Sequence, residues 1–221
     1  IHTIEAYMAA AEATTEPEWL DRAEKMTAFA YKVASKNNWR IPEYYDEEWQ
    51  PSLEAGKLCN DGRRYHEGYV TGHSMQLARF ALQVRAGLRS TGWAVPDYLM
   101  ELGTELFERA RVDGWRRTDG APGFSTAVND QGDPVPGEDE HQQWVVCEGV
   151  CATVAVRRAM LDDGHRIDEV EHFEHCYRSF VDYIHDYLIA QPGRWIRRLG
   201  PHNESVQPAK SSRWDVYHAI Q

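Results

Sequence analysis

Three side chains that could act on a polar small molecule lie close together in the segment that begins at Thr71. His73 is followed by Gln76 and Arg79, three and six residues later, and this spacing puts them on one face if the segment is helical. Histidine exchanges protons near neutral pH, while an amide and a guanidinium can hold oxygen atoms. The pattern predicts a site for chemistry, although a solvent-exposed histidine before a helix would look the same.

The spacing of apolar residues predicts the helix that positions these side chains. Four apolar residues recur at near-helical intervals and form one stripe, which indicates a helix to about residue 89. A polar run precedes it, with Thr71 or Ser74 available as the cap. His73 then lies at or just before the helix start, beside backbone amides and the positive end of the helix dipole. The stripe consists of Met75, Ala78, Leu82 and Ala86.

Further histidines and acids stand at comparable points of the chain. His2 and Glu5 lie in the first predicted helix, and His218 lies near the start of the last one. Each follows a long loop, or the place where such a loop would be. Glu148 shares a strongly apolar predicted helix with Trp144, so its carboxylate must be paired or face a polar cavity. A buried Glu–Arg pair without a functional role is the alternative interpretation.

Neither a metal nor a cofactor is predicted. His172 and His175 share a helix face, but no second cluster of metal ligands accompanies them. The sequence contains no Gly-rich phosphate loop, nucleophile elbow or His-Glu-x-x-His motif. Cys147 and Cys151 are four residues apart on a predicted helix, which favours free buried thiols over a disulfide and a reducing, cytoplasmic setting.

Charge and composition restrict the partners. A net charge of −11 over 221 residues argues against nucleic acid or an anionic membrane. There is no run of about 18 apolar residues, as a membrane span requires. Eight Trp and eleven Tyr suit a sugar-binding surface and large helix–helix interfaces equally well. We expect a small-molecule ligand and a single domain over residues 1–221; the formation of a homo-oligomer stays open.

The predicted elements repeat about three times as helix, short turn, helix and long loop. Stacked hairpins of this kind form an all-α solenoid or toroid, with the functional loops gathered at one end. Both ends of the chain fall within predicted helices, so we expect the chain to be part of a larger barrel and truncated at both ends. The predicted helices cover about residues 1–13, 19–36, 73–89, 96–112, 142–161, 167–189 and 214–221, with a short β-hairpin over 123–134.

Four short motifs, in matching order, resemble the N-acylglucosamine 2-epimerase superfamily, and within it the branch of mannose and sulfoquinovose isomerases. The resemblance covers nearly the whole chain. One departure is that Gln76 stands where the family has Glu. The motifs are His2-Thr3-Ile4-Glu5-Ala6, resembling Met-His-x-x-Glu-Ala; residues 72–80, resembling Gly-His-x-x-Glu-x-x-Arg-Leu; residues 144–148, resembling Trp-x-x-x-Glu; and residues 215–221, resembling Asp-x-Tyr-His-Ala-x-Gln.

The resemblance implies an (α/α)6 barrel, of which this chain would supply roughly the C-terminal half. It also implies a metal-independent isomerase that interconverts D-mannose, or a related aldose, and D-fructose through a cis-enediol. In that mechanism His218 is the base that moves the proton between C2 and C1, and His73 assists ring opening. The implied substrate-binding residues are His2, Glu5, Gln76, Arg79, Trp144, Glu148 and Trp195.

Other functions stay open on the sequence. A sugar 2-epimerase needs bases on both faces of C2, which would place His73 and His218 on opposite sides of the sugar. A sugar-binding toroid without catalytic activity agrees with Gln76 in place of the acid. A glycoside hydrolase needs two opposed carboxylates, and it is disfavoured because Glu148 has no evident acidic partner.

Overall fold

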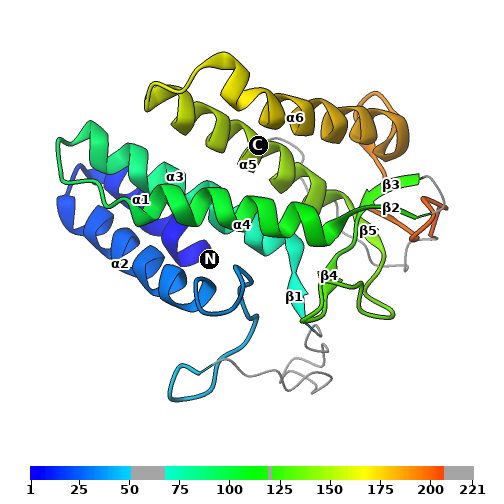
Figure 1. Cartoon of the computed structure of the whole chain (residues 1–221), viewed down its shortest axis with the longest axis horizontal. Helices are drawn as coiled ribbons and strands as arrows, with labels where there is room; N and C mark the ends of the chain where they lie inside the picture. Colours follow the sequence, from blue (N-terminus) through cyan, green and yellow to red (C-terminus); the bar gives the residue numbers. More distant parts are fainter. Residues whose placement is uncertain (51–67, 119–120, 207–221) are drawn as a thin grey trace.

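Three helical hairpins make up the body of the protein, which the computed structural model describes over residues 1–50, 68–118 and 121–206 (Figure 1). Each hairpin joins two helices through a short connection, and long connections lead to the next hairpin. The predicted all-α class is confirmed, because helices build the core and the described strands are two to four residues long. The α-helices of the described residues are α1 (His2–Thr14), α2 (Pro17–Ala34), α3 (Thr71–Ser90), α4 (Tyr98–Gly114), α5 (Gln143–Asp162) and α6 (Glu171–Tyr183).

The two ends of the hairpin stack differ. The short turns lie at one end, on the left in Figure 1, and the strand-bearing connections lie toward the other. This separation agrees with the prediction that the long loops gather at one end. The described strands pair antiparallel as β1–β4, β2–β3, β5–β8 and β6–β7. They are β1 (Tyr69–Val70), β2 (Trp115–Thr118), β3 (Ala121–Phe124), β4 (Ala127–Val128), β5 (His141–Gln142), β6 (Ile189–Gln191), β7 (Arg194–Trp195) and β8 (Arg198–Leu199).

Helix α3 is the centre of the core. It packs against α4 and α5 over most of its length and also contacts α1 and α2. Met75 and Phe80 on α3 have no exposed surface. Gly103 allows α4 to approach closely, because a Cβ at that position would lie 2.6 Å from the Leu82 side chain. The apolar stripe predicted for this segment therefore packs in the core, as amphipathic periodicity implies.

The cap predicted for α3 is wrong. Val70 is the N-cap residue, and no side chain caps the helix. Thr71 instead donates its hydroxyl hydrogen bond to the Ser125 carbonyl oxygen at 2.7 Å, which ties the start of α3 to the connection between α4 and α5. His73 consequently lies in the first helical turn. A tertiary partner has replaced the local one that the sequence offered.

The strand pairing predicted over residues 123–134 is also wrong in part. The turn forms, since the Asn129 side chain accepts the backbone N–H of Asp133 at 2.9 Å. However, β3 pairs with β2, and β4 pairs with β1. The predicted helix over 167–189 is likewise subdivided, into a 3-10 turn (Ile167–Val170), α6 and a π-turn (Ile184–Leu188). Local patterns indicated these elements without indicating their distant partners.

Four aromatic rings connect the β2–β3 hairpin to α6. The Trp115 ring lies 5.0 Å from that of Phe124, 4.7 Å from that of Phe180 and 5.6 Å from that of Tyr183, measured between centroids. The latter two contacts are edge-on, which is a favourable geometry for aromatic pairs. This cluster anchors the connection between α4 and α5 against α6.

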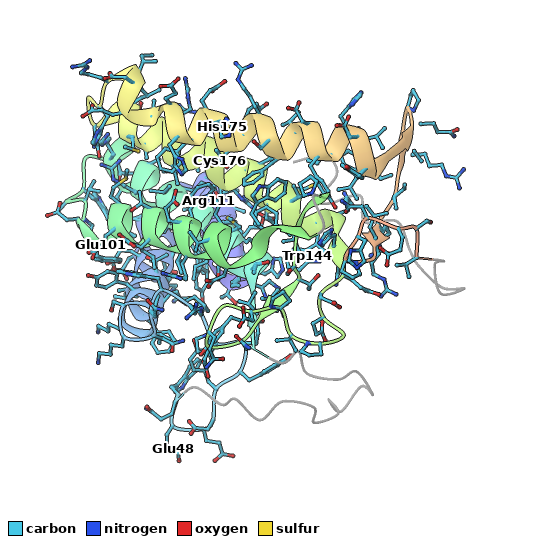
Figure 2. All side chains as sticks on the ribbon, turned by 45° about the vertical axis from the view of Figure 1, so that its right-hand side comes forward. Glu48, Glu101, Arg111, Trp144, His175 and Cys176 are labelled. Carbon is cyan, nitrogen blue, oxygen red and sulfur yellow. The ribbon has the colours of Figure 1, made fainter. Side chains whose placement is uncertain are left out.

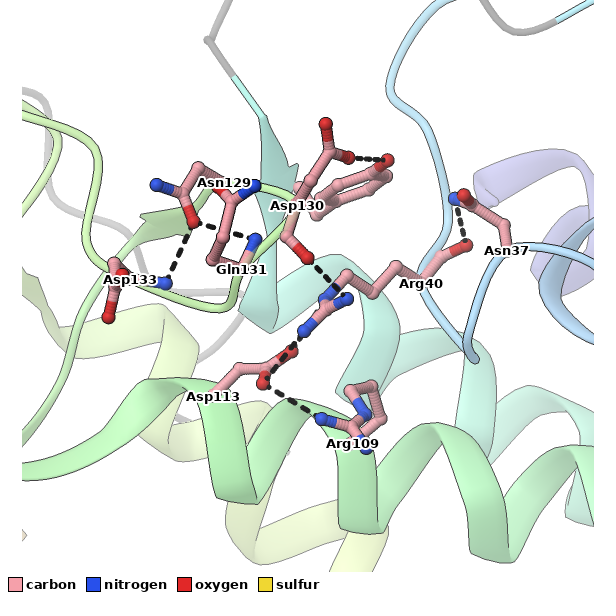
Figure 3. Close-up of polar contacts among 9 residues, drawn as sticks. Asn37, Arg40, Arg109, Asp113, Asn129, Asp130, Gln131 and Asp133 are labelled. Atoms are coloured by element: carbon pink, nitrogen blue, oxygen red, sulfur yellow. Dashed lines mark hydrogen bonds and ion pairs between the residues drawn. The ribbon is translucent and has the colours of Figure 1, made fainter.

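A buried ion pair fastens the connection after α2 to the end of α4 (Figure 3). Arg40 donates to both carboxylate oxygens of Asp113, at 2.8 and 3.1 Å, and to the Asp130 carbonyl at 2.9 Å. The two side chains are only 7% and 5% exposed. Arg109 donates to Asp113 as well. Arg40 thus joins three segments that are distant in sequence.

Replacing Arg40 by alanine should cost about 3–5 kcal/mol of unfolding free energy, because it leaves the Asp113 carboxylate buried with fewer compensating donors. Urea denaturation measures the change. The control is Lys25→Ala, which removes an exposed pair with Asp21 and should cost no more than about 0.5 kcal/mol. Equal effects of the two substitutions would contradict the structural role of Arg40.

A buried histidine holds the connection after β8. His141 is 3% exposed, and its Nδ1 hydrogen bonds to Asn203 Oδ1 at 2.8 Å. Tyr183 donates to the same oxygen at 2.8 Å. Burial lowers the pKa of His141 from its ordinary value of 6.5, although the hydrogen bond to Asn203 opposes the shift. The folded protein therefore favours the neutral imidazole.

Acidification should destabilise the protein through His141. Below about pH 6.5 the unfolded chain binds a proton that the folded protein resists, so the unfolding free energy falls as pH falls. In His141→Gln this loss between about pH 7.5 and about pH 5.5 should be smaller, as measured by urea midpoints. His185→Gln is the control, since the His185 side chain is 81% exposed. The interpretation fails if both variants keep the slope of the original protein.

Candidate active site

The predicted site residues of α3 and α5 face one another and form a ladder of contacts between the two helices. His73 faces Trp144 with ring centroids 5.2 Å apart. One turn further, Gln76 donates to Glu148 at 3.2 Å, and after another turn Arg79 donates to Glu148 at 3.0 Å. Because residues three or four apart lie on one helix face, these contacts follow one another along the facing sides of α3 and α5. The helix therefore places His73, Gln76 and Arg79 on one face, as their spacing predicted.

Glu148 is the most deeply buried residue of this ladder. Its side chain is completely buried, and that of Arg79 is 10% exposed. Arg79 uses Nε and Nη2 to reach both carboxylate oxygens, at 3.0–3.2 Å. Such bidentate, charge-assisted hydrogen bonds offset part of the cost of burying the charge. Of the two possibilities expected for this carboxylate, pairing or a polar cavity, the structure shows pairing, and the pair is the Glu–Arg pair that the sequence offered as the alternative to a functional role.

His73 is an accessible residue of this ladder. Its side chain is 31% exposed, and its Nδ1 lies 2.7 Å from Glu43 Oε2. The other Glu43 oxygen accepts the backbone N–H of Val70 at 3.3 Å. Sequence reasoning missed Glu43, which stands in a long loop without periodicity. Its preceding residues, Ile41 and Pro42, are buried, and this apolar pair was the available sign that the loop is anchored.

Trp144 lies against the first turn of α3, at the strand-bearing end of the molecule (Figure 2). Its indole N–H donates to Gln142 at 2.9 Å. Gly72 makes the approach feasible, because a Cβ there would overlap the six-membered part of the indole. A side chain at position 72 is therefore excluded on steric grounds, and the glycine allows the Trp144 indole to lie beside His73.

The remaining predicted residues are less closely joined to this ladder. His2 hydrogen bonds to Glu5 at 3.1 Å, and the His2 side chain is 69% exposed. Their helix packs against α3, which carries His73. Trp195 lies on β7, paired with Ile189. His218 lies outside the described residues.

Other candidate groups have structural partners. His172 Nε2 lies 2.7 Å from Glu108 Oε1 on α4. Within the described ranges, no three His, Cys, Asp or Glu side chains are grouped so that they could hold a metal ion. Cys147 and Cys151 are free thiols, as predicted. Burial raises the pKa of Cys151, and the nearby Glu148 charge adds to this shift. No helix among the described residues is long and apolar enough to cross a bilayer.

A groove continues from the ladder toward the short-turn end. It runs between α3 and α5 from Arg79 and has a volume of about 1020 Å³. Cys151 and Val154 lie in its wall, and Val154 is 48% exposed. Helix α5 is thus apolar on an accessible face as well as on its buried one. The ladder stands at the end of this groove.

Comparison with known proteins gives the family. The model of the family N-acylglucosamine 2-epimerase (GlcNAc 2-epimerase) matches residues 1–221. The chain is 31% identical to a D-mannose isomerase of Pseudomonas cannabina pv. alisalensis and 30% identical to one of Thermobifida fusca. Each comparison covers 100% of this chain and 51% of the relative. The chain therefore spans about half the length of these relatives.

Solved structures share the fold. A crystal structure of D-mannose isomerase superposes with a TM-score of 0.75 and 22% identity, over 91% of this chain and 48% of that one. A cellobiose 2-epimerase from Bacillus thermoamylovorans gives 0.66 and 15%, over 93% and 45%. The three hairpins correspond to part of an (α/α)6 barrel. Because the family model extends over the whole sequence, the chain belongs to the N-acylglucosamine 2-epimerase family.

Proposed function

We propose that the protein is a metal-independent aldose–ketose isomerase that interconverts D-mannose, or a related aldose, and D-fructose. The observation that carries the proposal is an accessible histidine, His73, placed between a carboxylate and an indole ring in a chain about 30% identical to D-mannose isomerases. Histidine suits proton transfer near neutral pH. An indole face suits the apolar face of a sugar ring.

The proposed reaction moves protons without changing the overall composition of the sugar. After ring opening, a base removes the proton from C2, and the electrons of that bond form the C1=C2 double bond of a cis-enediol as O1 gains a proton. The proton is then returned to C1 while O2 loses its proton, which yields the ketose. We assign the C2–C1 transfer to His218 and the ring opening to His73. The Arg79–Glu148 pair would hold the ladder rigid beside the sugar hydroxyls.

Gln76 is compatible with this role. Its amide donates to the Glu148 carboxylate at 3.2 Å, whereas an ionised acid at the same place would meet a like charge. In this chain Glu148 supplies the carboxylate and Gln76 supplies a neutral donor. The loss of the family acid therefore does not require a protein that only binds sugar.

Gln76→Glu should lower the unfolding free energy by about 1–3 kcal/mol near pH 7, because it replaces a hydrogen bond with repulsion between two buried carboxylates. The introduced carboxyl group would hold its proton more tightly in the folded state. The destabilisation should consequently grow as pH rises above about 4.3. Gln83→Glu, at an exposed position of α3, is the matched control. A Gln76 variant as stable as the control would contradict the described contact.

The isomerase activity is tested with EDTA-treated protein and D-mannose in D2O, followed by NMR. We expect D-fructose that carries deuterium. His73→Gln should reduce kcat/KM by about 10²–10⁴-fold, the usual contribution of an acid–base group. His185→Gln, with its 81% exposed side chain, should leave the rate unchanged.

Other products would redirect the proposal. Glucose from mannose, or N-acetylmannosamine from N-acetylglucosamine, would indicate a 2-epimerase. Binding of these sugars without turnover would favour a non-catalytic toroid. A His73→Gln variant with a normal rate would remove this histidine from the mechanism.

A further inference from the structure

We propose that Glu43 is a positioning residue that fixes the tautomer of His73, so that Nε2 is the nitrogen that exchanges a proton with the substrate. The assignment of the tautomer stands on geometry alone. The role of Nε2 toward a sugar rests on the proposed function.

The contact between Glu43 and His73 determines where the proton resides. An ionised carboxylate can only accept hydrogen bonds. At 2.7 Å from Glu43 Oε2, the Nδ1 atom of His73 must therefore carry the hydrogen. A neutral imidazole has a single N–H, so its Nε2 then presents the lone pair. An imidazole in the opposite tautomer would direct a lone pair at the carboxylate.

The position of Glu43 does not depend on His73. Its Oε1 accepts the Val70 backbone N–H, and its side chain is only 10% exposed. Three residues earlier, Arg40 is bound to Asp113 on α4. This buried ion pair and the burial of Ile41 fix the loop that presents the carboxylate. The acceptor is thus in place before any ligand binds.

The other groups around His73 leave Nε2 available to exchange a proton with the substrate. Trp144 lies against part of the ring, and the His73 side chain is 31% exposed. Within the described residues Nε2 makes no hydrogen bond. Among the described residues, Tyr45 is a further titratable group on which the Glu43 charge acts, and burial together with this charge raises the pKa of Tyr45 to about 12. Tyr45 consequently stays neutral at physiological pH.

The proton balance is closed within the site. Nε2 accepts the proton of the O1 hydroxyl of the cyclic sugar and forms an imidazolium, whose Nδ1–H remains hydrogen bonded to Glu43. The C1=O1 double bond forms as the C1–O5 bond breaks, and the carboxylate offsets the imidazolium charge without itself taking up the proton. Nε2 then gives the proton to the ring oxygen O5, which completes ring opening and regenerates the neutral histidine.

The direct test is ¹⁵N NMR of protein labelled at its ten histidines, with His73→Gln identifying the His73 signals. At a pH where the ring is neutral, we expect His73 to carry its hydrogen on Nδ1. In Glu43→Ala the population should move toward the Nε2–H form that free histidine prefers. Glu47→Gln, an exposed acid of the same loop, should leave the signals unchanged. Nε2–H at His73 in the original protein would overturn the proposal.

Kinetics then test the consequence for turnover. Glu43→Gln should lower kcat by about 10²–10⁴-fold with little change in KM, since it disturbs proton transfer rather than sugar contacts. Glu43→Asp should recover part of the rate by restoring a carboxylate, and thermal melts should confirm that the variants are folded. A normal kcat in Glu43→Gln would overturn the positioning role. If the protein turns over no sugar, the proposed function fails while the tautomer test still decides the assignment.

Discussion

The burial of one carboxylate constrains much of this structure. Glu148 has no exposed surface, so it must receive hydrogen bonds from within the protein or destabilise the fold. Arg79 and Gln76 supply them, and both come from α3. The requirement therefore sets the register of α3 against α5. The same register brings His73 to Trp144 one turn away.

Around this rigid pair of helices, the connections supply the groups that orient the site. Glu43 reaches His73 from the loop after α2, and Arg40 fastens that loop to α4. Thr71 attaches the start of α3 to the next connection. Helices thus carry the chemical groups, while loops anchored by buried polar contacts set their orientation. A histidine positioned by its helix alone would lie in the right place, but nothing would determine which ring nitrogen carries the hydrogen.

Periodicity in the sequence was enough to predict the six α-helices of the described residues, because apolar stripes report local structure and burial together; the helix predicted over 214–221 lies outside the described residues. Periodicity also indicated that Glu148 must be paired or face a polar cavity. It could not indicate the contacts of Glu43 or Asp113, because their partners are distant in the chain; Glu43 also stands in a loop without periodicity. The cap of α3 was misjudged for the same reason, since the hydroxyl of Thr71 bonds across the molecule. Local patterns predict elements, and long-range polar contacts become visible only once the elements are packed.

The separation of short turns from strand-bearing connections also has a consequence for the order of folding. Within each hairpin the two helices are near neighbours in the chain, so little loop entropy opposes their docking. Pairs such as β1 with β4 and β5 with β8 join segments far apart in sequence. They gain their partners only after the hairpins have stacked. The end of the molecule that carries His73 and Trp144 should therefore be the last to become ordered as the chain folds.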